Sequence, residues 1–75
     1  MKVGRYTLEQ DLKDLESAGC RVLAHCTCIK GHVILWHNKQ GHTVTQRHRT
    51  GSSIGRALPF PEAMADFQKA IKELV

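Results

Sequence analysis

The chain has 75 residues, with 11 Lys and Arg against 7 Asp and Glu, and a formal net charge of +4. A chain of this length forms one small domain, expected to span residues 1–75, and buries only about 60% of its extended surface. Its apolar runs are too short to cross a bilayer, and its 3 Cys cannot close into a set of internal disulfides. With a polar start that carries no apolar leader, the sequence predicts a reducing, cytoplasmic compartment.

The first expected element is a helix over residues 8–18. Thr7 and Gln10 match a capping box, in which the Thr7 hydroxyl accepts a hydrogen bond from the Gln10 amide. Gly19 can take the left-handed conformation that ends a helix. Between these signals an apolar stripe follows the helical period, made of Leu8, Leu12 and Leu15.

Three strands are expected next. Residues 21–29 alternate with a period of two, and residues 32–37 form a short apolar strand followed by a hairpin loop over 38–41. The third strand has a polar row on one face and is expected near a sheet edge; the row is Thr43, Thr45, Arg47 and Arg49. Residues 50–55 are rich in Gly and Ser, which predicts a loop.

A second helix is expected to begin at Pro61, because proline suits the first position of a helix. Its apolar stripe is Ala63, Phe67, Ala70, Ile71 and Leu74. The predicted order is α-β-β-β-α, in an α+β two-layer domain with a three-stranded antiparallel sheet and both helices packed on one face. One core is expected between the helices and the sheet, containing Leu12, Leu15, Ile34, Phe67 and Ile71.

The segment His25-Cys26-Thr27-Cys28 raises the question of a metal site. Two cysteines two residues apart on a strand point the same way and can share a metal, with His32 or Cys20 as further ligands. A Cys-x₂₋₄-Cys spacing and a distant second pair are missing, so we interpret Cys26 and Cys28 as small buried side chains. No metal and no cofactor are expected.

The distribution of charge indicates the kind of partner. No acidic residue falls between Ser17 and Pro61, whereas this stretch holds all five histidines. A surface of one sign attracts the opposite sign, and phosphate is a common anion. The candidate nucleic-acid contacts are Lys39, Arg47, His48, Arg49 and Arg56. The alternative is a solvated strand whose cations protect a sheet edge.

Trp36 has two interpretations as well. It is either a core residue beside Ile34 or a surface on which a base stacks.

The segment 12–51 contains several sequence features that resemble those of a known family. They are the helix end 15–19, the tripeptide Lys30-Gly31-His32, Trp36, a hairpin that contains glycine, and Val44-Thr45 before a basic segment. This order resembles the double-stranded-RNA-binding fold and the HicA-type mRNA interferase toxins built on it. Those toxins carry a histidine on the second strand, so the resemblance implies that His32 is catalytic and that a cognate antitoxin is a partner.

The chemistry of His32 and Lys30 supports the same hypothesis. An imidazole can remove the 2′-hydroxyl proton of RNA near neutral pH while a cation stabilises the phosphorane, without a metal. The alternative is a strand-end histidine with no chemical role.

Two functions therefore remain open. One is an RNA-interacting protein, either a binder or a histidine-dependent ribonuclease. The other is a non-enzymatic module, such as a small phage or plasmid product, that docks on an acidic host protein; neither involves a membrane.

Overall fold

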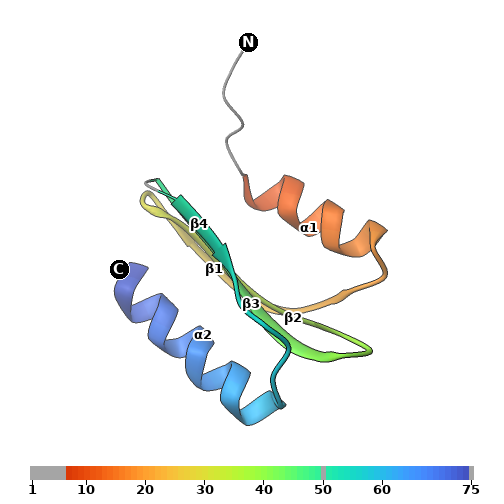
Figure 1. The fold of residues 1–75 in the computed structure, drawn as a ribbon. Coiled ribbons are helices and arrows are strands. Elements are labelled where there is room, and N and C mark those ends of the chain that lie inside the picture. The colour runs from red at the N-terminus through yellow and green to blue at the C-terminus, as the bar shows by residue number, and fades with distance from the viewer. Residues whose placement is uncertain (1–6, 50, 75) are drawn as a thin grey trace.

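The computed structural model describes residues 7–49 and 51–74. Two helices enclose four strands in the order α1 (Leu8–Ser17), β1 (Arg21–Cys28), β2 (Gly31–Asn38), β3 (Gly41–His48), β4 (Gly51–Ile54) and α2 (Phe60–Leu74). The strands form one antiparallel sheet in which each strand pairs with the next along the chain (Figure 1). The α+β class, the antiparallel sheet and the two helices confirm the coarse prediction. No helix in the described part of the chain is long and apolar enough to span a membrane.

The prediction of three strands was wrong, because part of the expected loop pairs with β3 as β4. Ile54 lies opposite Thr45, and Ser52 lies opposite Arg47. Gly and Ser have low strand propensity, but the outer edge of β3 offers backbone groups that pairing can satisfy. As a result β3 is an inner strand, and Thr43 and Thr45 are buried instead of forming a polar edge row.

The two helices pack on opposite faces of the sheet, and not on one face as predicted (Figure 1). Helix α2 packs on Val33 and Leu35 of β2, whereas Asp11 of α1 reaches His32 of the same strand. Successive residues of a strand point to opposite faces, so these contacts place the helices on different sides. Val33, Ile34 and Leu35 are all fully buried. A strand that is apolar on both faces does not indicate from its sequence which helix covers which face.

The main core lies between α2 and the sheet. It consists of Val33, Leu35, Val44, Ala63, Phe67, Ala70 and Leu74, with Ile71 packed at its margin. The expected single core was wrong in its membership, because Ile34 faces the side of α1. Leu12 and Leu15 are only half-buried. We call the two sides of the sheet the α1 face and the α2 face.

A β-bulge in β1 changes which side chains share a face. Val22 lies opposite Trp36 and Ala24 lies opposite Leu35, so Leu23 is the additional residue. Val22 therefore lies on the α1 face, although simple alternation placed it with Ala24. Cys28 remains on the α2 face, where its Sγ lies 3.7 Å from the carbonyl oxygen of Leu74.

Candidate functional site

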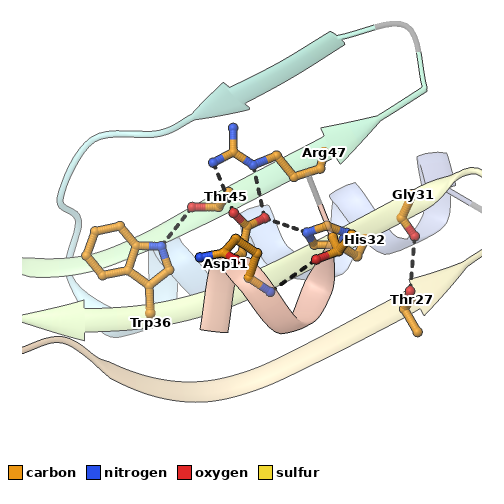
Figure 2. A network of polar contacts seen from close by, with 9 residues as sticks. Asp11, Thr27, Gly31, His32, Trp36, Thr45 and Arg47 are labelled. Atoms are coloured by element: carbon orange, nitrogen blue, oxygen red, sulfur yellow. Dashed lines mark hydrogen bonds and ion pairs between the residues drawn. The ribbon is translucent and has the colours of Figure 1, made fainter. Parts of the chain in front are cut away.

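A buried polar cluster, consisting of Asp11, His32 and Arg47, joins α1 to the sheet. Oδ2 of Asp11 lies 2.6 Å from Nε2 of His32 and accepts a hydrogen bond of 3.1 Å from Nε of Arg47. A second contact of 3.4 Å runs from Nη2 of Arg47 to Oδ1. Figure 2 shows the carboxylate between the imidazole and the guanidinium. Three elements, α1, β2 and β3, thus meet at one carboxylate.

Local structure brings these three side chains together. The Thr7 hydroxyl caps α1 by accepting from the Gln10 amide at 3.1 Å, as predicted, while the Gln10 side chain donates to Asp14 instead of returning to the cap. The cap fixes the first turn, which contains Asp11. On the sheet, His32 and Arg47 are directly opposite in the register of β2 and β3. Opposite residues of antiparallel strands lie close enough for their side chains to share a partner.

Gly31 helps to set this register. Its φ is +150°, a conformation that side chains rarely adopt, and a Cβ at this position would overlap the backbone carbonyl of Arg47. The absence of a side chain therefore lets β2 begin close to β3, immediately before His32. The Thr27 hydroxyl of β1, which lies opposite His32, donates to the Gly31 carbonyl oxygen at 3.4 Å (Figure 2).

The cluster is almost completely shielded from water. The side chains of Asp11 and His32 are each 5% exposed, and that of Arg47 is 14% exposed. A buried carboxylate is costly unless charged or polar groups surround it, and here two donors satisfy it. The cluster is therefore a strong structural tie between α1 and the sheet. Chemically, a carboxylate that orients an imidazole is also the arrangement that general-base catalysis uses.

Asp11 was not identified from the sequence as a site residue, although a signal was present. It lies three residues after Leu8 and four before Leu15, so it belongs to the apolar stripe of the helix. A carboxylate on the buried face of a helix requires a cationic or hydrogen-bonding partner. That partner comes from strands far away in the sequence, which spacing alone does not reveal.

The two predicted catalytic residues differ in exposure. Lys30 is exposed in the turn between β1 and β2, and His32 is buried two residues later. The Nε2 atom of His32 faces Asp11. Access of RNA to the imidazole would therefore require α1 to move away from the α1 face.

The predicted nucleic-acid contacts fall in separate parts of the molecule. Arg47 binds Asp11, and His48 Nε2 lies 3.2 Å from Oε1 of Gln46, whereas Arg49 is exposed in the turn after β3. Lys39 is exposed in the hairpin between β2 and β3, at the opposite end of the sheet. Arg56 lines an open hollow beside Glu62 and Asp66. Those two carboxylates reduce the positive potential around Arg56.

The structure adds one neighbour that the sequence did not indicate. The Arg49 amide donates a hydrogen bond of 3.1 Å to the Lys30 carbonyl, so the turns after β1 and β3 lie side by side. Both side chains are exposed, and Ile29 beside them is 83% exposed. We call Lys30 and Arg49 the turn pair.

Other aromatic and histidine side chains have structural contacts. Trp36 donates from Nε1 to the Thr45 hydroxyl at 2.9 Å (Figure 2). The ring of His42 stacks on His37 at a centroid distance of 5.1 Å and meets the edge of Phe60 at 5.2 Å. These contacts secure the hairpin end of the sheet against the start of α2.

Two further questions are whether the described residues form a metal site and whether the chain matches a known protein. Within residues 7–49 and 51–74, no group of three or more His, Cys, Asp or Glu side chains is placed to hold a metal. Comparisons with protein-family models, with curated proteins and with solved structures found no match to this chain.

Proposed function

We propose that this chain is a small RNA-binding protein that contacts phosphate groups through the turn pair. The observation that carries the proposal is the hydrogen bond from the Arg49 amide to the Lys30 carbonyl, because it holds side by side the two turns that carry these exposed cations. Both come from the stretch of chain that has no acidic residue. Neighbouring cations bind successive phosphates and release the counterions condensed on them.

Cleavage of RNA by His32 is the second part of the proposal, and it is supported by the resemblance to HicA-type toxins and by the imidazole–carboxylate contact. Lys30 would stabilise the phosphorane, and His32 would act as the base after α1 moves. Binding does not depend on this step. The alternative, docking on an acidic protein, uses the same turn pair.

The test is the salt dependence of RNA binding. Fluorescence anisotropy with a labelled single-stranded RNA should give a log–log slope of about −0.7 per phosphate contact. Replacing Lys30 and Arg49 together by Ala removes two contacts and should flatten the slope by about 1.4. The control replaces Lys69 and Lys72, two exposed lysines of α2, by Ala; it makes the same charge change and should leave the slope unaltered.

Two results would reject the proposal. One is an unchanged slope in the Lys30 and Arg49 double variant. The other is no binding by the unmodified protein at low salt, which would favour an acidic protein as the partner.

A further inference from the structure

Among the described residues, strand β1 pairs with β2 only and so leaves one edge of the sheet open. It is eight residues long. Natural edge strands are usually short or carry charges or proline that block further pairing. Apart from Arg21 at its start, β1 contains neither a Lys, Arg, Asp or Glu nor a proline. The bulge at Leu23 leaves the register from Ala24 to Cys28 regular. The opposite edge strand, β4, has only four residues.

Two exposed hydrophobic side chains flank the regular part of this edge, Leu23 at the bulge and Ile29 in the turn after β1. Leu23 is 42% exposed and Ile29 is 83% exposed. They lie three residues before and three residues after Cys26. If β1 pairs with a second β1 in antiparallel register centred on Cys26, Leu23 of each copy lies opposite Ile29 of the other. Each pair then covers apolar area that a single chain leaves in water.

The charges agree with this register. It places Lys30 opposite Val22, so no positive side chain directly faces another. A register centred on His25 would place the two His25 rings opposite each other and Ile29 opposite Arg21, which leaves the apolar side chains unmatched. Sliding one strand by a single residue relative to the other would place side chains from opposite faces of the sheet opposite each other. The edge is therefore complementary to itself in one register.

We propose that two copies of this chain form a two-fold dimer through antiparallel pairing of their β1 strands, centred on Cys26. The pairing joins both four-stranded sheets into one continuous sheet. A two-fold axis perpendicular to the sheet keeps both α1 helices on one face and both α2 helices on the other.

The position of Cys26 gives the dimer a specific chemical signature. Directly opposite residues in an antiparallel pair have Cα atoms about 4.5–5.5 Å apart, within the range of about 4.4–6.8 Å that a disulfide bridges. Cys28 lies opposite Ala24 in the same register. The two Cys28 residues are then offset by four residues, about 13 Å along the strand, which no disulfide spans.

The experiment uses two single-cysteine variants of the full chain. One retains Cys26 (Cys20→Ser, Cys28→Ser), and its control retains Cys28 (Cys20→Ser, Cys26→Ser). With oxidised glutathione, two Cys26 thiols lose two protons and two electrons to form one disulfide, and the glutathione is reduced to two thiols. We expect a covalent dimer from the Cys26 variant and none from the Cys28 variant.

Light scattering measures the non-covalent dimer independently. The unmodified chain under reducing conditions should show the mass of two chains, and Leu23→Lys should shift it to one. Ile54→Lys is the control, because Ile54 is 60% exposed on the opposite edge strand and should leave the dimer intact. A single-chain mass at every concentration, or a dimer lost in Ile54→Lys and retained in Leu23→Lys, would overturn the proposal. Equal cross-linking through Cys28 would also overturn it.

Discussion

At the scale of single residues, Asp11 connects the helix to the sheet. Its carboxylate lies on the buried side of α1 and contacts an imidazole and a guanidinium from two adjacent strands. Such a group stabilises the fold only while its partners are present, because an unpaired buried charge is strongly unfavourable. The cluster therefore determines how firmly α1 is held on the α1 face.

Asp11→Ala should lower the free energy of unfolding by about 3 kcal/mol, because it removes the buried carboxylate that joins α1 to His32 and Arg47. Chemical denaturation measures this change. Asp14→Ala is the control, since Asp14 is exposed on the same helix and its loss should cost less than about 1 kcal/mol. Equal losses in the two variants would show that the cluster does not anchor α1.

His32→Ala tests catalysis, and the burial of His32 predicts that this variant is also less stable than the unmodified protein. Loss of an exposed strand-end histidine would leave the melting curve nearly unchanged, but a side chain that is 5% exposed and touches Asp11 cannot be removed without cost. We expect a lower Tm together with loss of any RNA cleavage. Cleavage must be measured well below the Tm of the variant. His25→Ala, at an exposed histidine of β1, should retain both properties. Full cleavage by folded His32→Ala would remove this histidine from the mechanism.

At the scale of elements, local signals identified both helices and the first three strands. The Thr7 cap and the leucine stripe predicted α1 to within one residue of its end, and the switch to a period of two predicted β1. Strand β4 could not be predicted, because its Gly and Ser residues become extended only by pairing with β3. The helix faces could not be predicted either, since Ile34 and Leu35 are equally apolar and point to opposite sides.

The two helices should contribute differently to stability. Phe67 is 6% exposed in the main core, so Phe67→Ala should cost about 3–5 kcal/mol. Leu15 is only half-buried on α1, so Leu15→Ala should cost clearly less, about 1–2 kcal/mol. Denaturation curves of both variants measure the difference. A loss for Leu15→Ala as large as that for Phe67→Ala would mean that α1 is buried as deeply as α2.

At the scale of the whole molecule, the fold places the basic residues of the stretch between Ser17 and Pro61 in separate regions. The meander places the turns after β1 and β3 at one end of the sheet and the Lys39 hairpin at the other. The sequence contains the positive stretch, and the type of partner that it indicates stays a prediction. It could not predict that Arg47 binds Asp11, or that Lys30 and Arg49 lie side by side, because both contacts depend on strand register. Among the predicted RNA-contact residues, Arg49 is therefore the first candidate, and Lys30, predicted as a catalytic residue, lies beside it.

Titration of ¹⁵N-labelled protein with a short single-stranded RNA tests most directly whether the turn pair contacts RNA. We expect the largest amide chemical-shift changes at Ile29, Lys30 and Arg49, with smaller changes at Lys39 and along α2. The Lys30 and Arg49 double variant should lose these changes while its remaining spectrum stays that of the folded protein. Changes confined to α2 or to the Lys39 hairpin, or no changes at low salt, would contradict RNA binding by the turn pair.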